Sequence, residues 1–434
     1  MEPMTVAIFL ILLLFLAAGV HIGVALGAAG LLGIFLVVSD TAAWAQLRSI
    51  PYSSSAVYTL AVVPMFIMMG SFFHRAGFTG DMYQAAYLWL GRLRGGLAIA
   101  TTVGSAAFGA VTGSSVANAA MFSRVALPEM VRHGVAKSLA VGCIAASGTL
   151  ASLIPPSLLL VIYGIITEQS VAALLVAGLL PGLLSMAVYI GGIYFRVLRK
   201  PALSPRLDLD VDWRERFRSI MPLWAAVAVF FLVMGGIYAG YFTPTQAGAV
   251  GAFAAFALGL IQRRYGFRGI WEGLRETGST TATILLIMVG GAFFARFLGY
   301  SGFVRDISDS LLGMELPPFA YLAVFMVVVV LLGMFLEAFS IMVLILPLMF
   351  PILVGAGYDP IWLGVITIKL VEIGLITPPV GLNVYVVKSS SPIPISLEQV
   401  YRGVSPFLLL DLVTLALLII FPSIVLFLPS VMAD

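Results

Sequence analysis

Residues 149–157 read Thr-Leu-Ala-Ser-Leu-Ile-Pro-Pro-Ser, and residues 374–381 read Gly-Leu-Ile-Thr-Pro-Pro-Val-Gly. Each stretch places two adjacent prolines inside a long apolar run that would otherwise span a membrane as one helix. Proline lacks the backbone N–H and clashes with the carbonyl four residues earlier, so each helix is predicted to break there. Because lipid cannot hydrogen-bond the freed carbonyls, a break at mid-depth must be buried in protein or line a cavity.

Two interpretations of these breaks are open. A simple proline kink is common in membrane helices, where neighbouring groups satisfy the freed backbone. Freed carbonyls beside serine or threonine hydroxyls also make a ready cation site. A single break would not separate these interpretations, but two breaks at matching places favour the ion site.

The composition is that of a membrane protein. The chain has 434 residues, of which 61% are hydrophobic and 10% charged, with a mean hydropathy of +1.10. Soluble domains carry about 25% charged residues. The single cysteine rules out an internal disulfide, and the three histidines have no ligand-like spacing. The start, Met1-Glu2-Pro3, has no basic region, so we expect a first span and not a cleaved signal.

Two further segments look like re-entrant helical hairpins. Residues 97–130 and 319–355 are apolar, but each has a small or polar centre, and each arm is short for a full crossing. Two short ordinary spans, or a helix interface of small residues, are the alternatives. The broken helices are expected at 139–165 and 361–388, and a polar connection at 39–55. Ordinary spans are expected at 4–20, 22–38, 56–73, 171–195, 220–239, 245–261, 277–297 and 404–428.

The basic residues predict the topology. With both termini outside and the hairpins re-entrant, the inner loops hold eighteen of the 23 Lys and Arg residues and the outer loops hold two. The one clear linker, 196–219, holds seven of them and ends in a short amphipathic helix of the kind that lies at a membrane surface.

The two halves echo each other at a spacing of about 220 residues. Leu127-Pro128 matches Leu346-Pro347, and the two proline pairs match each other. We therefore expect an all-α polytopic membrane protein built as an inverted repeat with two re-entrant hairpins and two broken helices. The first repeat covers 1–195, the cytoplasmic linker 196–219 and the second repeat 220–434.

The hairpin tip Thr112-Gly113-Ser114-Ser115, the two Pro-Pro breaks and their spacing resemble the large membrane (M) subunit of tripartite ATP-independent periplasmic (TRAP) transporters. The resemblance covers nearly the whole chain. It implies a sodium-driven importer of the elevator-type ion transporter superfamily, located in the bacterial cytoplasmic (inner) membrane. It also implies a periplasmic substrate-binding protein and a small four-helix membrane subunit, expected as a separate chain because no such extension precedes the first span.

The resemblance also implies two sodium sites with Na⁺ as the coupling ion, and neutral oxygen ligands suit such a hard cation. At the second site Thr377 joins three backbone carbonyls. In this sequence Thr112 stands where serine is usual and Ala151 where glycine is common, so close backbone approach at Ala151 is in question. The first set is Thr112, Ser115, Ala151, Ile154 and Pro156, and the second is Gly333, Gly374, Thr377 and Val380.

A small organic acid is the expected substrate. Four polar side chains near the tips and breaks can hydrogen-bond a carboxylate: Ser114, Asn118, Ser340 and Asn383. A single polar residue of this kind more often forms a hydrogen bond between packed helices. Of the charged residues in apolar segments, we expect Lys369 and Glu372 to pair structurally, Arg124 to snorkel to the inner face, and Asp411 to be structural. Glu337 either tunes the second ion site or bonds nearby backbone.

Other functions are less well supported. A stand-alone sodium- or proton-coupled organic anion carrier of the same superfamily, without a binding protein, is the runner-up. An intramembrane hydrolase would need paired aspartates, a zinc motif or a Ser-His dyad at membrane depth, and none is seen. There is no nucleotide-binding loop, so ATP drive is not expected. Membrane lipid is an expected partner, and nucleic acid is not.

Overall fold

The computed structural model describes residues 3–206, 212–306, 313 and 316–432, and every regular element in this part of the chain is a helix. Six helices are long and apolar enough to cross a membrane, or up to eight if each of two bent pairs is one span. This agrees with the predicted all-α polytopic membrane fold. The first half of the chain contains α1 (Pro3–Ala17), α2 (Ile22–Val37), α3 (Asp40–Ser55), η1 (Tyr58–Ala61), α4 (Val62–Arg75), α5 (Phe78–Leu90), α6 (Gly96–Thr112), α7 (Ser115–Arg132), α8 (Lys137–Leu153), α9 (Leu158–Thr167), α10 (Val171–Ala177) and α11 (Leu179–Arg199).

The linker and the second half follow in the order that the sequence predicts. They comprise η2 (Pro201–Leu203), α12 (Trp213–Ile220), η3 (Met221–Leu223), α13 (Trp224–Tyr238), α14 (Pro244–Ile261), α15 (Phe267–Tyr300), α17 (Pro318–Gly333), α18 (Ala338–Gly355), α19 (Pro360–Ile376), α20 (Leu382–Ser390), α21 (Leu397–Ile420) and α22 (Ser423–Met432). Each half thus contains a helical hairpin followed by a broken helix, first α6–α7 and α8–α9, then α17–α18 and α19–α20. The inverted orientation of the halves stays a prediction.

Three boundaries differ from the expectation. The predicted polar connection 39–55 is the helix α3, which ends at a 52° bend before the next helical segment. Residues 262–276, which connect the predicted spans 245–261 and 277–297, mostly form the start of α15, which is 34 residues long. The amphipathic helix in the linker is present as α12, but it continues through η3 into α13 and does not form a separate element.

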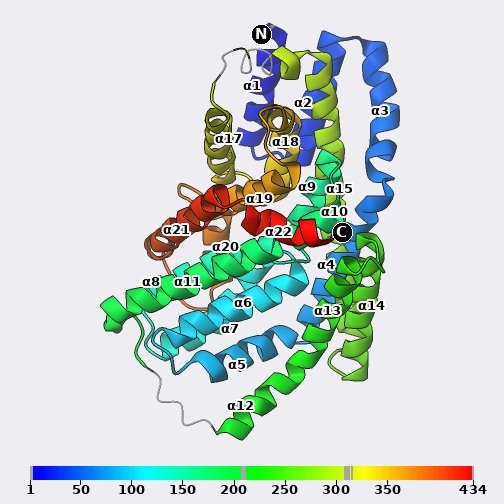
Figure 1. Cartoon of the computed structure of the whole chain (residues 1–434). Coiled ribbons are helices and arrows are strands. Elements are labelled where there is room, and N and C mark those ends of the chain that lie inside the picture. The colour runs from blue at the N-terminus through cyan, green and yellow to red at the C-terminus, as the bar shows by residue number, and fades with distance from the viewer. Residues whose placement is uncertain (1–2, 207–211, 307–312, 314–315, 433–434) are drawn as a thin grey trace.

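The buried side chains form two hydrophobic clusters. The smaller one joins α1 and α2 to α15, where glycines let the backbones touch: a Cβ on Gly30 would lie 2.5 Å from the backbone nitrogen of Phe294. The larger one surrounds both broken helices and the first hairpin. Figure 1 shows α6, α7 and α8 of the larger cluster side by side, while α2, α3 and α15 run together around the smaller cluster.

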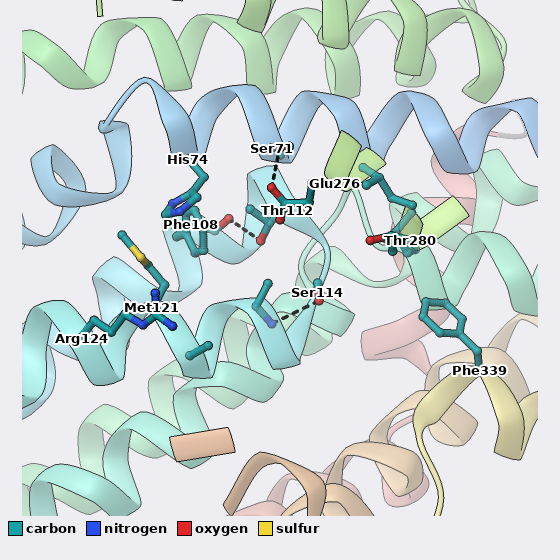
Figure 2. A pocket seen from close by; sticks show the side chains of 15 residues that line it. Ser71, His74, Phe108, Thr112, Ser114, Met121, Arg124, Glu276, Thr280 and Phe339 are labelled. Carbon is teal, nitrogen blue, oxygen red and sulfur yellow. Dashed lines mark hydrogen bonds between the residues drawn. The ribbon is translucent and has the colours of Figure 1, made fainter. Parts of the chain in front are cut away.

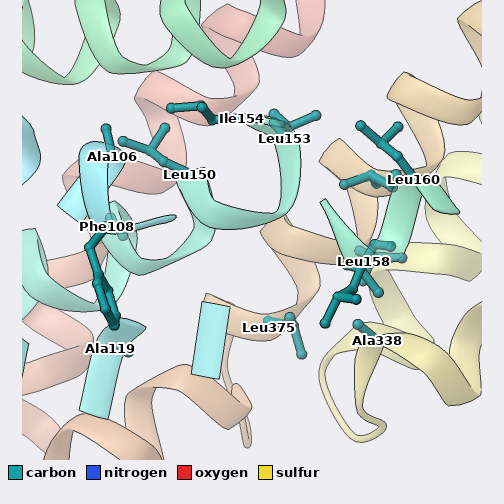
Figure 3. Packing of buried hydrophobic residues seen from close by; sticks show 14 of the residues in the cluster. Ala106, Phe108, Ala119, Leu150, Leu153, Ile154, Leu158, Leu160, Ala338 and Leu375 are labelled. Carbon is teal, nitrogen blue, oxygen red and sulfur yellow. The ribbon is translucent and has the colours of Figure 1, made fainter. Parts of the chain in front are cut away.

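Residues from both halves meet around the first break. Leu158, two residues after the first proline pair, lies near Ala338 of the second hairpin and Leu375 of the second broken helix (Figure 3). The broken helices therefore pack into one core instead of facing lipid separately.

Candidate functional site

The tip of the first hairpin is a two-residue turn between α6 and α7. Gly113 has φ +61°, a left-handed conformation that glycine adopts without strain. The hydroxyl of Ser114 accepts a hydrogen bond from the backbone N–H of Ala117 at 3.3 Å and so caps α7. The structure therefore supports a hairpin with its apex at residues 113–114.

The first break consists of the four residues between α8 and α9, and the chain bends by 45° there. The Pro155–Pro156 bond is cis. The hydroxyl of Ser157 donates to the carbonyl of Ser152 and accepts from the N–H of Leu160 at 3.3 Å. Residues 151–160 are all buried, so the break is satisfied inside the protein, as the proline chemistry requires.

The hairpin tip and the first break are in direct contact. A Cβ on Gly113 would lie 2.7 Å from the carbonyl oxygen of Pro156, and one on Gly109 would lie 2.6 Å from the Cα of Ala151. The backbones therefore approach closely at Ala151 although it is not a glycine, because Gly109 on the facing helix leaves the space. All five residues of the predicted first sodium site are buried, and Pro156 and Ala151 lie at this contact. Thr112 donates its hydroxyl to the carbonyl of Phe108 at 3.1 Å, which leaves its oxygen lone pairs available.

The tip of the second hairpin is organised by Glu337. Its carboxylate accepts from the N–H groups of Ser340 at 2.8 Å and Phe339 at 3.2 Å, and from the Ser340 hydroxyl. Of the two roles considered for Glu337, bonding of nearby backbone is therefore the one that the structure shows. Ser340 is held by the same carboxylate, so its hydroxyl proton is already engaged.

The second break repeats the arrangement of the first. The Pro378–Pro379 bond is cis, and a Cβ on Gly374 would lie 2.5 Å from the Cα of Gly333 at the end of α17. The hydroxyl of Thr377 donates to the carbonyl of Ile373 at 2.5 Å. The prolines of the second break, Pro378 and Pro379, are exposed, whereas those of the first break are buried.

Tyr401 of α21 contacts the second break, and the sequence did not predict this contact. Its hydroxyl lies 2.6 Å from the carbonyl oxygen of Pro379 and 2.7 Å from that of Val380. One of the four predicted ligands of the second site, Val380, therefore already has a hydrogen-bond partner, although a carbonyl oxygen has a second lone pair.

A cavity of about 260 Å³ lies beside the first hairpin tip, between α4, α15 and α7. Figure 2 shows Thr112 and Ser114 near its centre, His74 and Arg124 toward one end, and Glu276 and Thr280 toward the other. Arg124 is exposed and lines this cavity, where a bound anion would meet it, and its snorkelling to the inner face stays a prediction.

The four predicted substrate residues have different surroundings. Ser114 lines the cavity, whereas Asn118, Ser340 and Asn383 do not. Asn118 is buried and bonded twice to Ser105, with both distances 2.9 Å. Asn383 is fully buried, and neither polar atom of its amide has a partner among the described residues. A buried amide without partners is costly, so Asn383 is the one of these three that points to a missing ligand or water.

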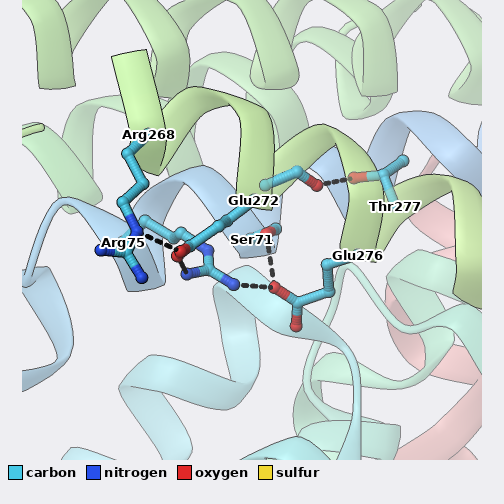
Figure 4. A network of polar contacts seen from close by, with 7 residues as sticks. Ser71, Arg75, Arg268, Glu272, Glu276 and Thr277 are labelled. Atoms are coloured by element: carbon cyan, nitrogen blue, oxygen red, sulfur yellow. Dashed lines mark hydrogen bonds and ion pairs between the residues drawn. The ribbon is translucent and has the colours of Figure 1, made fainter. Parts of the chain in front are cut away.

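The wall of the cavity on α4 and α15 is fixed by ion pairs. Arg75 contacts both Glu272 and Glu276, and the hydroxyl of Ser71 donates to Glu276 at 2.8 Å (Figure 4). Gly70, next to Ser71, touches the first hairpin tip: a Cβ there would lie 2.8 Å from the Cα of Thr112.

The predicted pairing of Lys369 with Glu372 is wrong. The ammonium of Lys369 lies 2.5 Å from the carboxylate of Asp411 on α21, and both side chains are almost fully buried. Tyr189 of α11 donates to the same carboxylate at 2.6 Å. No ion pair of Glu372 is found in the described part of the chain, and its carboxylate is buried beside Ser152. Asp411 joins α19 and α11 to α21 through these contacts, and its structural role stays a prediction.

Comparisons with known proteins place this chain in a family. A model of the DctM component of tripartite ATP-independent periplasmic transporters matches residues 9–424. The chain is 35% identical over 408 residues to the C4-dicarboxylate TRAP transporter large permease protein DctM of Pseudomonas aeruginosa, covering 93% of each chain. It is 31% identical to the sialic acid TRAP transporter large permease protein SiaM of Vibrio cholerae, covering 86% of each.

A solved structure shares the fold. The YdaH transporter of Alcanivorax borkumensis superposes with a TM-score of 0.61 at 16% identity, over 97% of this chain and 99% of that one. At this level of identity the likeness concerns the fold alone.

Proposed function

Because the chain belongs to the DctM-component family of TRAP transporters, which are permeases and not enzymes, we propose that it is the large subunit of a sodium-coupled importer of a small organic acid. Family and composition make it a multi-pass protein of the bacterial inner membrane. The observation that carries the proposal is that each hairpin packs backbone to backbone against the proline break of its own half.

Sodium coupling is supported by the chemistry at these two contacts. Each offers backbone carbonyls and a threonine hydroxyl, all uncharged oxygens, at the interruption of an apolar helix. Oxygen-only sites select hard cations, and discontinuous helices are where secondary transporters bind coupling ions. The first site would use Thr112, Ser115, Ala151, Ile154 and Pro156, and the second Gly333, Gly374, Thr377 and Val380.

A carboxylate substrate fits the cavity beside the first hairpin. Ser114 offers a hydroxyl there, and Arg124 offers a guanidinium, which binds carboxylates through paired hydrogen bonds. Both relatives compared above carry the name of an acid, a C4-dicarboxylate in one and sialic acid in the other. Asn383 lies outside this cavity, but its amide is unsatisfied, whereas Asn118 and Ser340 already have partners and are weaker candidates.

The position of the cavity supports an elevator movement as the mechanism. The cavity lies between the ion-paired wall of α4 and α15 and the first hairpin, so substrate and ions bound at the hairpins would move together past that wall. The relatives are named large permeases, so we propose a small four-helix membrane subunit and a periplasmic binding protein as partners, with both termini of this chain periplasmic.

Reconstituted uptake tests the proposed function. Proteoliposomes that contain this chain and its small subunit should accumulate a radiolabelled C4-dicarboxylate or sialic acid only with an inward sodium gradient and the loaded binding protein. Uptake without the binding protein would favour the stand-alone carrier. Uptake that continues when potassium replaces sodium would reject sodium coupling.

Removing one hydroxyl from either site should weaken sodium binding. We expect Thr377→Ala or Ser115→Ala to raise the half-saturating sodium concentration for uptake about tenfold, because each removes an oxygen ligand. Thr367→Ala is the matched control, since Thr367 is buried on the same helix as Thr377 and bonds the carbonyl of Leu363 at 2.7 Å. Unchanged sodium dependence in both variants would discard the assigned ligands.

Neutralising the cavity arginine should impair substrate handling and not sodium binding. We expect Arg124→Gln to lower the initial uptake rate of a carboxylate about tenfold, from the loss of a charged hydrogen bond, with the half-saturating sodium concentration unchanged. Arg132→Gln on the same helix, where the side chain is 77% exposed, should leave uptake as in the wild type. Equal rates for the two variants would exclude contact between Arg124 and the substrate.

A further inference from the structure

An apolar face that no described residue covers runs from the start of α12 through η3 to the start of α13. Five large side chains on it are between 41% and 70% exposed. Their positions follow a helical period of three to four residues, so they share one side of the continuous helix formed by α12, η3 and α13. They are Trp213, Phe217, Ile220, Met221 and Trp224.

Arginines border this face on both sides. At 100° per residue, Arg214 and Arg218 fall along one edge of the apolar face and Arg216 falls along the other. Arg214 and Arg218 are exposed. Arg216 is packed against the ring of Trp213, with its guanidinium carbon 5.1 Å from the ring centroid, and its Nε and Nη2 have no hydrogen-bond partner among the described residues.

The helix is fixed to the arm that leads into the first hairpin. The indole N–H of Trp89, at the end of α5, donates to the carbonyl of Arg216 at 3.1 Å, and its ring lies 5.6 Å from that of Phe217. The chain then turns at residues 91–95 and enters α6. A ligand bound to α12 would therefore be coupled, through Trp89, to the base of the hairpin that carries the proposed sodium ligands.

We propose that α12 is a binding surface for anionic phospholipid headgroups of the inner leaflet. Tryptophan and phenylalanine beside arginine form the pattern of helices at the boundary between headgroups and acyl chains. A phosphate group would pair with the exposed Arg214 and Arg218 at one edge, whereas Arg216 is buried and holds Trp213 in place. At 100° per residue, the exposed Asp212 and Glu215 fall on the side of the helix away from the apolar face. The edge with Arg214 and Arg218 is therefore positive and complements an acidic lipid better than a zwitterionic one.

Lipid titration tests this proposal without any substrate. The full-length protein in detergent is titrated with short-chain phosphatidylglycerol or phosphatidylcholine, and bound lipids are counted by native mass spectrometry. We expect tight binding of phosphatidylglycerol that the double variant Arg214→Gln/Arg218→Gln weakens about 30-fold, since each basic residue at a membrane surface contributes about 1 kcal/mol.

A charge control and a variant of the apolar face make the result specific. Arg206→Gln removes one charge from the same linker but outside α12, and it should change binding less than twofold. Trp213→Ser/Phe217→Ser should weaken phosphatidylglycerol as well, because the apolar face holds the acyl chains. Equal binding of the two lipids by the wild type, or equal weakening by Arg206→Gln and the α12 double variant, would overturn the proposal.

Discussion

Replacing Lys369 with methionine is expected to destabilise the folded protein by about 3–5 kcal/mol, the cost of leaving a buried carboxylate without its partner. Asp411 would keep only the hydroxyl of Tyr189, and both residues lie in the interior where α11, α19 and α21 meet. The measurement is the melting temperature of the purified protein, or the folded yield by size-exclusion chromatography if the variant does not survive purification.

The double variant Lys369→Met/Asp411→Leu separates the loss of an ion pair from the loss of packing. With both charges removed, most of the stability should return, because apolar side chains of similar volume replace a buried ion pair at little cost. Arg402→Met, which breaks the exposed pair of Arg402 with Glu398, should change the melting temperature little. A single Lys369 variant as stable as the wild type would show that this pair is not buried as described.

Adding one methyl group at Gly374 is expected to abolish sodium-dependent uptake at physiological sodium. The new Cβ would lie 2.5 Å from the Cα and 2.9 Å from the carbonyl carbon of Gly333, and backbone atoms cannot turn aside as a side-chain end can. Overpacking of this kind costs about 1–3 kcal/mol. If the hairpin moves away to relieve the clash, two carbonyl ligands separate, and sodium affinity should fall about 10- to 100-fold.

Gly299→Ala is the matched control for this variant, since nothing lies within 4 Å of a Cβ at that helical position. It should transport as the wild type does. The half-saturating sodium concentration, measured in proteoliposomes for both variants, decides the matter. Normal sodium dependence in Gly374→Ala would mean that the contact of α17 with α19 is not part of a sodium site.

Sequence reasoning succeeded where local chemistry dictates the structure. A proline pair breaks a helix wherever it occurs, and small residues at an apolar centre allow a tight turn, so both breaks and both hairpins were predictable. The residues of α3 include Asp40, Gln46 and Arg48, and that polarity resembled a loop although the segment is helical. Polarity alone does not distinguish a surface helix from a connection.

The failures concern partners that lie far apart in the chain. Lys369 and Glu372 are three residues apart, so a local rule pairs them, but the true partner of Lys369 is 42 residues away on α21. Tyr401 was missed because its hydroxyl reaches the second break from another helix. At Ala151 the compensating glycine, Gly109, stands on the opposite helix, and only the packed structure brings the two together.

Direct binding of radioactive sodium to the purified chain, measured by scintillation proximity, tests most directly whether both interruptions hold a cation. It needs neither the substrate nor the partner proteins. We predict saturable binding of two ions per chain that potassium does not displace, with one ion lost in Gly374→Ala. Absence of saturable binding, or the same two ions in that variant, would contradict this account.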